Sequence, residues 1–395
     1  MKRRVLQLIG SFHQGGSELQ AVQLARLLHE SGRYELHVAC LDSAGVLRDE
    51  IEGLAIGDIP EFRLTSFYDR NAMTQLRRFT RLLREREIDI IQTHDFYTNV
   101  FGMAAGRLAR VPARIAARRE TTGWRTPAQR LVERAAYRAA HSVVANAGAV
   151  RDQLVKEGVR RDKITVIYNG LNRERITPNP DLTREQKLAL LGLPQTADRR
   201  FVTIVANLRH PVKDHSTFLR AARRVREAVP QACFVIAGEG PLADETRAFA
   251  RQLGIEQSLF FLGRCERVAE LLSVSDVCVL SSKAEGFSNA IIEYMAASRP
   301  AVVTDVGGAR EAVSDGESGY LVPAGDDEKM GARITTLLLD PPKADSMGRR
   351  AREIVEMKFS LRAQLERTER LYDRLLESAS RSAHERINTV RQEGV

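Results

Sequence analysis

The stretch that decides the fold is Val277-Cys-Val-Leu280-Ser-Ser-Lys-Ala-Glu285-Gly-Phe-Ser-Asn289-Ala-Ile-Ile-Glu293. Four consecutive apolar residues, 277–280, indicate a buried strand, and the spacing of apolar residues after Asn289 indicates a helix. A strand that is apolar on both faces and leads through a loop into a helix is typical of a parallel sheet covered by helices. This stretch therefore predicts an α/β fold.

The same alternation of strand and helix extends over most of the chain. The expected strands form two series, 5–9, 35–41, 88–93, 114–117, 142–145 and 164–167, then 201–206, 233–237, 259–262, 277–280, 301–304 and 319–322. Residues 171–200 contain three prolines and no strand signal, so they are a predicted linker with one short helix at 184–191. We expect two doubly wound, Rossmann-like domains, 1–172 and 173–360, that face a central cleft.

Composition excludes several other classes of protein. The 395 residues are 43% hydrophobic and 28% charged, as in globular proteins. No apolar run approaches the ~18 residues of a membrane span, and the apolar stretch 5–10 is too short for a signal peptide. The four cysteines are far apart, without a Cys-x-x-Cys pair, so we expect free thiols and a cytoplasmic protein. No Asp-x-Asp and no ligand cluster at metal spacing occurs, so we expect neither a metal nor a cofactor.

Arginine gives the chain an uneven charge. The formal net charge is +9, and residues 102–138 contain nine arginines against Glu120 and Glu133, a local net of +7 (9 − 2). Apolar residues lie between these arginines: Leu108, Val111, Ile115, Trp124, Leu131 and Val132. Two interpretations stay open, a solvated face and a docking surface for an anionic membrane or a lipid-diphosphate acceptor. Nucleic-acid binding is disfavoured because aromatic residues, which stack on bases, are only 6%.

A glycine pair follows the first expected strand. Gly15 and Gly16 precede Ser17 and Gln20, whose spacing matches a capping box, so a helix is predicted to begin at Ser17 and to end near residue 31. Glycines beside the free N–H groups of a helix N-terminus let a phosphate approach the backbone closely. The alternative is an ordinary tight turn.

Charged residues follow two strands of the second series. Glu285 lies in the loop after 277–280, and Glu293 lies about one turn into the next helix. With a helix N-terminus between them, whose dipole favours an anion, they suit a ligand that carries a phosphate between two polyols. Arg209 and Lys213 follow strand 201–206 and offer two cations to phosphate oxygens. The alternative for all four residues is solvated surface charge.

Two further features carry less weight. Gly238-Glu-Gly240-Pro-Leu-Ala matches the dinucleotide pattern G-x-G-x-x-A, but the next expected strand is followed by Arg264 rather than by an acid that would hold a ribose. We interpret it as a turn near a nucleotide. His94 ends strand 88–93, where it is either a partner for a substrate hydroxyl or a structural histidine.

Together these motifs strongly resemble the retaining glycosyltransferases of family 4, which have the GT-B fold. The most specific part is Glu285-Gly-Phe-Ser-Asn-Ala-Ile-Ile-Glu293, which matches the paired-glutamate motif of that family. Also similar are Gly15-Gly-Ser-Glu18, Tyr168-Asn-Gly170, Arg209 with Lys213, Gly238-Glu-Gly-Pro241, and Val306-Gly-Gly308 followed by Glu311. The resemblance covers essentially the whole chain.

The resemblance implies a role for each predicted site residue. Arg209 and Lys213 would bind the donor diphosphate, and Glu285 would hold hydroxyls of the transferred sugar. The backbones of Gly286, Phe287 and Ser288 would assist Glu285, Asn289 would meet the phosphates, and Glu293 would hold the ribose.

The remaining roles concern the first domain and the base. Gly16 would bind the diphosphate from the other domain, and His94 would lie beside the reacting sugar. The base would lie near Gly238, Gly240, Gly263 and Arg264.

The resemblance also implies an activity. We expect a retaining hexosyltransferase that uses a nucleoside-diphosphate sugar and a glycan or lipid-linked acceptor, in cell-surface polysaccharide or glycoconjugate synthesis, at the inner face of the membrane. The alternative is an enzyme of the same fold without transfer, an epimerase or phosphorylase. Many relatives carry a second histidine two residues after the first, where this chain has Phe96. A helix from about Leu361 is expected to cross back, adding about 361–395 to the first domain, and the polar tail after Ser378 is expected to be loose.

Overall fold

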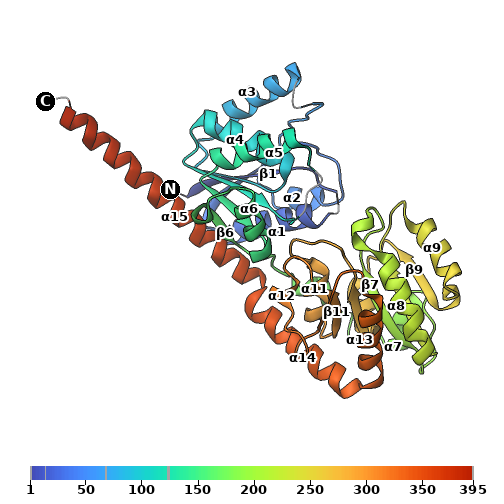
Figure 1. Cartoon of the computed structure of the whole chain (residues 1–395). Coiled ribbons are helices and arrows are strands. Elements are labelled where there is room, and N and C mark those ends of the chain that lie inside the picture. Colours follow the sequence, from blue (N-terminus) through green and yellow to red (C-terminus); the bar gives the residue numbers. More distant parts are fainter. Residues whose placement is uncertain (1, 14, 67–68, 122–124, 394–395) are drawn as a thin grey trace. The chain divides into compact units, whose positions relative to one another are not determined.

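The computed structural model describes residues 2–13, 15–66, 69–121 and 125–393, and the side chains as far as residue 381. The chain divides into two compact units, which are coloured along the sequence in Figure 1. Unit 1 consists of Met1–Asn169 and Leu361–Val395, and unit 2 consists of Gly170–Ser360. Unit 2 is therefore one continuous segment between the two parts of unit 1.

Unit 1 is built on a parallel sheet. Over its described residues the six strands are β1 (Arg3–Ile9), β2 (Tyr34–Cys40), β3 (Ile90–Thr93), β4 (Ala113–Arg118), β5 (Ser142–Ala145) and β6 (Ile164–Val166). Their order is β2-β1-β3-β4-β5-β6. The direction of winding thus reverses between β1 and β3, which pair from Val5 with Ile90 to Leu8 with Thr93. Ligands of open α/β sheets bind beyond the carboxyl ends of the strands at such a switch point.

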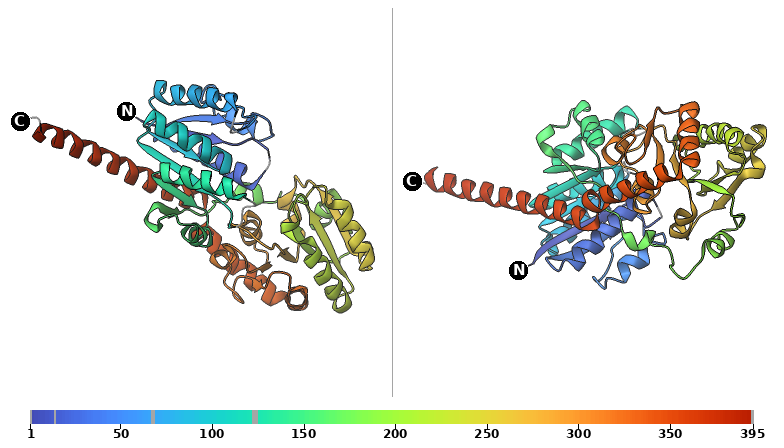
Figure 2. Two further views of the ribbon diagram at one scale, coloured as in Figure 1. Left: turned by 45° about the horizontal axis from the view of Figure 1, so that its top comes forward. Right: turned by 90° about the horizontal axis from the view of Figure 1, so that it is seen from below.

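Helices cover this sheet. They are α1 (Gly16–Glu30), α2 (Arg48–Glu52), α3 (Arg70–Glu85), α4 (Phe96–Ala109), α5 (Pro127–Ala139), α6 (Gly148–Lys156), the short helix η1 (Arg161–Lys163) and α15 (Leu361–Glu393). Helix α4 packs against both α3 and α5. Helix α15 packs along unit 1 against α1 and β4 (Figure 2) and places Leu371 and Tyr372 in the core. The helix expected to return to the first domain is confirmed.

Unit 2 contains a second parallel sheet. In the part of the chain that the structure describes, its six strands are β7 (Arg200–Val205), β8 (Ala232–Ala237), β9 (Leu259–Gly263), β10 (Val277–Leu280), β11 (Ala301–Thr304) and β12 (Tyr320–Val322). Their order, β9-β8-β7-β10-β11-β12, is that of the Rossmann fold. The switch point lies between β7 and β10, which are hydrogen-bonded neighbours.

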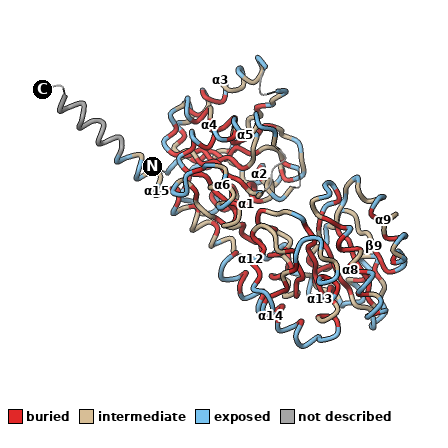
Figure 3. The backbone as a smooth tube through the Cα atoms, viewed as in Figure 1, coloured by how far each residue is buried: buried red, intermediate tan, exposed pale blue. Residues whose placement is uncertain are grey.

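Both faces of the second sheet are covered. The helices are α7 (Arg184–Leu190), α8 (His215–Ala228), α9 (Ala243–Gln252), α10 (Val268–Val274), α11 (Asn289–Ala296), α12 (Ala309–Ala312), α13 (Asp327–Leu339) and α14 (Pro341–Lys358), with short helices η2 (Arg173–Ile176), η3 (Pro211–Lys213) and η4 (Glu256–Ser258). Side chains of β8 alternate between two apolar clusters, Phe234 and Ile236 in one and Cys233 and Val235 in the other. This alternation follows from the two-residue period of a strand, and Figure 3 shows buried backbone through the strands.

The two sequence segments that connect the units lie side by side within unit 2. Leu171 pairs with Ser360 in a parallel bridge, and Leu171 N donates a hydrogen bond to Phe359 O at 2.8 Å. The ring of Phe359 in turn packs against Phe287, with ring centroids 4.9 Å apart. The chain therefore enters and leaves unit 2 at one place.

Most expected elements are confirmed, and the expectation for the C-terminal tail is wrong. Each expected strand is present within two residues of its predicted bounds. The cysteines are free, and three of them are buried. The tail after Ser378 is not loose, because α15 continues to Glu393. Residues 379–393 contain neither glycine nor proline, so nothing in this stretch stops the helix.

Candidate active site

Two of the predicted site residues meet at the switch point of unit 2. Lys213 follows β7, Glu285 follows β10, and Lys213 Nζ lies 2.6 Å from Glu285 Oε1. Ser282 Oγ donates to the same carboxylate oxygen at 2.6 Å. Ser281 Oγ donates to Lys213 O at 2.9 Å and holds the backbone on the lysine side. The pair is therefore positioned by the residues that directly follow β10.

A glycine lets a neighbouring loop touch the backbone of Glu285. Gly307 has a φ of +56°, and a Cβ at this position would lie 2.2 Å from Glu285 O. The next residue, Gly308, donates its N–H to Gly286 O at 2.7 Å. Only glycine combines the left-handed conformation with this close approach. The Val306-Gly-Gly308 motif thus supports the loop that carries Glu285.

The Gly238–Gly240 turn lies against the segment that carries Arg209. A Cβ on Gly238 would lie 2.0 Å from Ala206 O, and a Cβ on Gly240 would also meet this segment. Glu239 lies between the two glycines, and its Oε1 is 3.2 Å from Arg209 Nη2, with both side chains about half exposed. The glycines therefore have a packing role, and Arg209 is held at the carboxyl end of β7.

The other carboxylate of the paired-glutamate motif lies on α11. The helix begins at Asn289 with Ser288 as its N-terminal cap residue, and Phe287 is buried just before it. Glu293 lies in the second turn, and burial raises its pKa to about 7, while the charge of Arg175 acts in the opposite direction. Glu293 therefore changes charge near neutral pH.

Arg264 lies apart from these residues on the sheet. It follows β9, which is the edge strand, and β8 and β7 lie between β9 and β10. Its side chain is exposed. The structure thus brings together Lys213 and Glu285, whereas Arg264 is separated from the strand before Lys213 by β8 and from the strand before Glu285 by β8 and β7.

The start of α1 in unit 1 differs from the prediction. The helix begins at Gly16, with Gly15 as its cap residue, so Ser17 lies inside the first turn. The predicted capping box is wrong, because the Gln20 side chain turns toward α15. There its Oε1 accepts a hydrogen bond from Gln364 Nε2 at 3.1 Å.

A carboxylate of the chain itself covers the glycine turn. A Cβ on Gly15 would lie 2.2 Å from Glu18 Oε2. Burial is the main cause that raises the pKa of the Glu18 carboxyl. The Glu18 carboxylate therefore occupies the space beside Gly15 that the missing side chain leaves open.

His94 lies at the carboxyl end of β3 and is held by a buried network. Its Nε2 is 2.7 Å from Gln7 Oε1. Gln7 Nε2 donates to Tyr372 Oη at 3.0 Å, and Tyr372 Oη donates to Gln92 Oε1 at 2.5 Å. Since the Gln7 amide nitrogen donates to Tyr372, its oxygen accepts from His94 Nε2–H. The C-terminal helix thus orients the histidine.

The histidine ring is neutral and buried. His94 is 2% exposed, and burial, with the charge of Arg119, holds its pKa well below the usual value. Among the described residues Nδ1 has no hydrogen-bond partner. His94 therefore presents an acceptor nitrogen rather than a positive charge.

The apolar residues of the arginine-rich segment 102–138 do not share one environment. Val111 and Ile115 were expected at a membrane interface, but they are 2% and 0% exposed. They belong to the buried part of unit 1 because β4 and the turn before it run through this segment. Leu108 and Leu131 are exposed, and Trp124 lies outside the described residues.

Some of the arginines also have structural roles. Arg118 pairs with Glu157, and Arg125 pairs with Glu120 and Glu133. These pairs account for both acidic residues of segment 102–138. The local excess of positive charge that remains is therefore carried by the other arginines.

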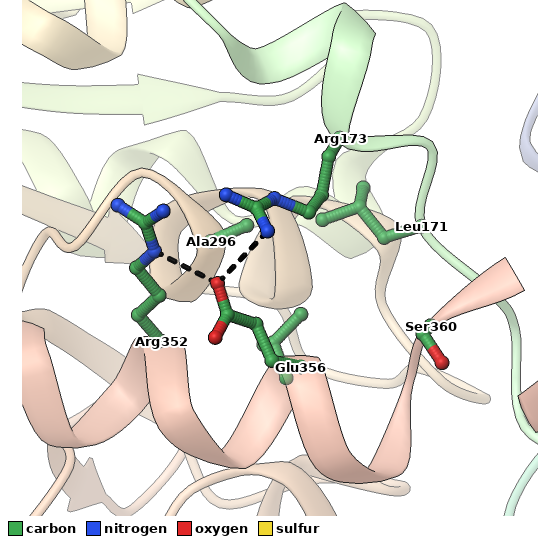
Figure 4. A pocket seen from close by; sticks show the side chains of 7 residues that line it. Leu171, Arg173, Ala296, Arg352, Glu356 and Ser360 are labelled. Atoms are coloured by element: carbon green, nitrogen blue, oxygen red, sulfur yellow. Dashed lines mark hydrogen bonds and ion pairs between the residues drawn. The ribbon is translucent and has the colours of Figure 1, made fainter.

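A small cavity of about 20 Å³ lies elsewhere in unit 2 (Figure 4). Arg173 and Arg352 both pair with Glu356 at its edge. It is lined by Leu171, Arg173, Ala296, Arg352, Val355, Glu356 and Ser360. A cavity of this volume holds about one water molecule, so it is too small for a sugar nucleotide.

Neither a metal cluster nor a membrane-spanning helix is found in the described part of the chain. No group of three or more histidine, cysteine, aspartate or glutamate side chains there is arranged to hold a metal ion. Across the same residues, no helix is both long and apolar enough to span a bilayer.

Sequence reasoning missed several residues that hold the predicted ones. Ser282 bonds Glu285, Gln7 bonds His94, and Tyr372 bonds Gln7. Ser282 lies three residues before Glu285, a spacing that favours a local side-chain contact. Tyr372 lies 280 residues or more from its partners, so no sequence pattern indicated it.

Each half of the chain matches a family model. Residues 14–175 match "Glycosyltransferase Family 4", and residues 193–354 match "Glycosyl transferases group 1". The paired-glutamate motif and the Arg209–Lys213 segment both lie in the second match.

Three curated relatives align over large parts of the chain. EpsF of Bacillus subtilis (strain 168), which is assigned as a glycosyltransferase, is 29% identical over 77% of this chain and 79% of its own length. The N-acetyl-alpha-D-glucosaminyl L-malate synthase of Bacillus anthracis is 31% identical over 50% of each chain. The UDP-Gal:alpha-D-GlcNAc-diphosphoundecaprenol alpha-1,3-galactosyltransferase of Escherichia coli is 27% identical over 64% of this chain and 67% of its own.

A solved structure has the same fold. HepE of Anabaena, in complex with UDP, superposes with a TM-score of 0.82 at 22% identity and covers 94% of this chain and 100% of its own. The two sheets, their helices and this likeness define a GT-B protein with glycosyltransferase relatives, which confirms the expected fold class. The chain belongs to glycosyltransferase family 4.

Proposed function

We propose that this protein is a retaining, metal-independent hexosyltransferase. It moves a hexosyl group from a nucleoside-diphosphate sugar to a hydroxyl of a glycan or lipid-linked acceptor, in polysaccharide or glycoconjugate synthesis. The observation that carries the proposal is the Lys213–Glu285 pair beside the N-terminus of α11, at the switch point of unit 2. A nucleoside-diphosphate donor is also supported by the name of the Escherichia coli relative, which specifies UDP-galactose.

In the proposed donor site, Lys213 and Glu285 bind different parts of the donor. Lys213 forms an ion pair with Glu285. When the donor binds, Lys213 and Arg209 turn to the diphosphate, and Glu285 accepts hydrogen bonds from sugar hydroxyls. Asn289 and the backbone of Gly286, Phe287 and Ser288 meet the donor at the start of α11, and Glu293 holds the ribose.

The proposed chemistry follows from this distribution of charge. The bond between the anomeric carbon and the leaving phosphate breaks, and a bond to the acceptor oxygen forms on the same face of the sugar. The acceptor proton passes to the leaving phosphate. Negative charge grows on the diphosphate as the bond breaks, so cations and a helix N-terminus fixed beside it stabilise the transition state more than the ground state.

A coupled assay tests this proposal. The purified protein is incubated with UDP- and GDP-sugars and with extracts of lipid-linked and soluble glycans, and release of nucleoside diphosphate is followed. Activity that requires an acceptor, persists in EDTA and falls by ~100-fold in Lys213→Met supports it, the fold-change being that of a lost charge-assisted contact in the transition state. A product with inverted anomeric configuration by NMR refutes the retaining mechanism.

The acceptor is proposed to be negatively charged. L-malate and diphosphoundecaprenol appear in the names of two relatives, and both are anionic. Net positive charge on this chain favours such a partner by electrostatic attraction.

We also propose that helices α3, α4 and α5 dock on an anionic membrane at its cytoplasmic face. Exposed arginines on and beside these helices form no ion pair within the described part of the chain: Arg70, Arg77, Arg81, Arg107, Arg110, Arg130, Arg134 and Arg138. Met73, Leu108 and Leu131 are exposed on the same helices. Cations interspersed with apolar side chains suit an interface with anionic lipid headgroups.

Vesicle flotation tests the membrane proposal. The protein is expected to float with vesicles that contain phosphatidylglycerol and not with pure phosphatidylcholine. Leu131→Glu is expected to weaken flotation, whereas Leu339→Glu in unit 2 is a matched control, since these leucines are 65% and 64% exposed. Equal flotation of both variants contradicts the proposed surface.

A further inference from the structure

Arg119 holds a distinctive position among the arginines of unit 1. It directly follows β4, so it lies at the carboxyl end of the sheet, where His94 also lies at the end of β3. β3 and β4 are hydrogen-bonded neighbours. The charge of Arg119 acts on His94 and contributes to its lowered pKa. Arg119 therefore lies near His94, the residue predicted to lie beside the reacting sugar.

The guanidinium of Arg119 is not matched by a carboxylate. Arg118 pairs with Glu157, and Arg125 pairs with Glu120 and Glu133. Over the described residues Arg119 forms no ion pair, and its Nη1 donates instead to the amide oxygen of Asn169 at 2.8 Å. The side chain is half-buried, with its Nε atom withdrawn from water. A guanidinium that loses water without gaining a carboxylate is costly, which points to a ligand.

Buried polar atoms around Arg119 also lack partners. In the part of the chain that is described, Arg119 Nε, Asn146 Oδ1 and His94 Nδ1 have no hydrogen-bond partner. Asn146 is 3% exposed, and its Nδ2 donates to Arg119 O at 3.3 Å, so these residues are close together. Unsatisfied buried groups are rare in native proteins and call for an explanation. One donor on a cation and two acceptors suit a ligand that has both an anionic oxygen and hydroxyl groups.

Two acidic residues near Arg119 are engaged elsewhere. Asp95 Oδ1 accepts a hydrogen bond from Thr98 N at 2.9 Å and caps α4. Glu18 Oε2 lies against Gly15. Burial raises the pKa of both carboxyls, and neither forms an ion pair with Arg119 within the described residues, although both act on it electrostatically. Burial also lowers the pKa of Arg119, but only to about 10, so the guanidinium remains charged at neutral pH.

We propose that Arg119 is a specificity residue that binds a phosphate or carboxylate of the acceptor, while His94 and Asn146 accept hydrogen bonds from its hydroxyls. The inference rests on the proposed glycosyltransferase function and assigns the acceptor's charged group to one side chain. Acceptors without an anionic group close to the reacting hydroxyl are then poor substrates.

Anion binding to the full-length protein tests the assignment. Thermal unfolding is followed while inorganic phosphate or malonate is added at constant ionic strength, with sodium chloride as the reference salt. Wild type is expected to be stabilised by at least one of the two anions, and the more effective one identifies the acceptor group as phosphate or carboxylate. Arg119→Gln is expected to bind that anion about tenfold more weakly or worse, as for loss of a hydrogen bond to a charged group.

Three controls accompany this measurement. Arg161→Gln, which changes an exposed arginine in η1 of unit 1, is expected to respond to the anions as wild type does. UDP is expected to stabilise wild type and Arg119→Gln equally, which shows that the variant is folded, and Arg119→Lys is expected to retain part of the anion response. No anion effect on wild type, or an equal effect on Arg119→Gln, overturns the proposal.

Other outcomes separate this proposal from the function on which it rests. If Arg119→Gln loses the response to UDP but keeps the response to the anions, Arg119 belongs to donor binding and the proposal fails. If wild type responds to the anions but to no nucleoside diphosphate, the glycosyltransferase function fails, whereas the anion site stands.

Discussion

Replacing Glu293 by glutamine is expected to stabilise unit 2 above neutral pH, because burial raises the pKa of this carboxyl to about 7. Its ordinary value is 4.5, so the shift is about 2.5 (7 − 4.5). At ~1.36 kcal/mol for each pKa unit, the ionised carboxylate costs the folded state about 3 kcal/mol. Glutamine has a similar shape and no charge, so it avoids this cost.

The sign of the pH dependence follows from proton binding. Between pH 4.5 and about 7 the folded protein holds the proton of Glu293, whereas the unfolded chain has released it. Protonated Glu293 therefore contributes its full stabilisation to wild type below pH 4.5. This contribution falls as the pH rises from 4.5 to about 7, and the free energy of unfolding then reaches a plateau. The Glu293→Gln variant lacks this decline.

Urea unfolding of both proteins from about pH 5 to about pH 8 measures the effect. The free energy of unfolding of Glu293→Gln minus that of wild type is expected to grow by roughly 2–3 kcal/mol across this range. For Gln252→Ala, which changes an exposed uncharged residue on α9, the same difference is expected to stay constant. A constant difference for Glu293→Gln would refute the reasoning.

Other variants test the contacts around the site. Ser282→Ala removes one of the hydrogen bonds to Glu285 and is expected to raise the donor KM several-fold with little change in stability. Ser282→Thr, which keeps a hydroxyl, is expected to restore the KM. An unchanged KM in Ser282→Ala contradicts the role of Ser282 in positioning Glu285. Gly307→Ala forces a side chain into a left-handed backbone against Glu285 O and is expected to lower the free energy of unfolding by about 1–3 kcal/mol. It is also expected to weaken donor binding, and thermal unfolding with and without UDP measures both effects. Tyr372→Phe leaves two buried glutamine side chains without the hydroxyl and is expected to cost about 1–3 kcal/mol in urea unfolding, a cost of zero being incompatible with the network.

The strands were predictable because each is a short run of buried apolar residues. In β10 all four residues, Val277–Leu280, are buried, so the pattern required no partner to be recognised. The loop chemistry after β10 was also predictable in kind, since Glu285 and Lys213 follow strands whose carboxyl ends share one edge. Their direct pairing was not predictable, because the sequence does not state that β7 and β10 are neighbours.

Errors arose where a local pattern competed with a distant partner. Ser17 and Gln20 have the spacing of a capping box, but Gln20 bonds Gln364 across 344 residues. Segment 102–138 combined a buried strand with exposed helix faces, so its arginines looked alike. Arg118 and Arg119 are adjacent, yet only the folded chain places Glu157 beside the first of them.

The paired connections at Leu171 and Ser360 have a consequence for the history and the engineering of this chain. Because entry to and exit from unit 2 are hydrogen-bonded neighbours, unit 2 has the topology of a cassette spliced into a host domain at one point. Related chains could exchange this cassette by recombination at two nearby junctions without remaking the sheet of unit 1. A chimera joined at these two positions is therefore the natural route to replacing unit 2 while unit 1 is retained.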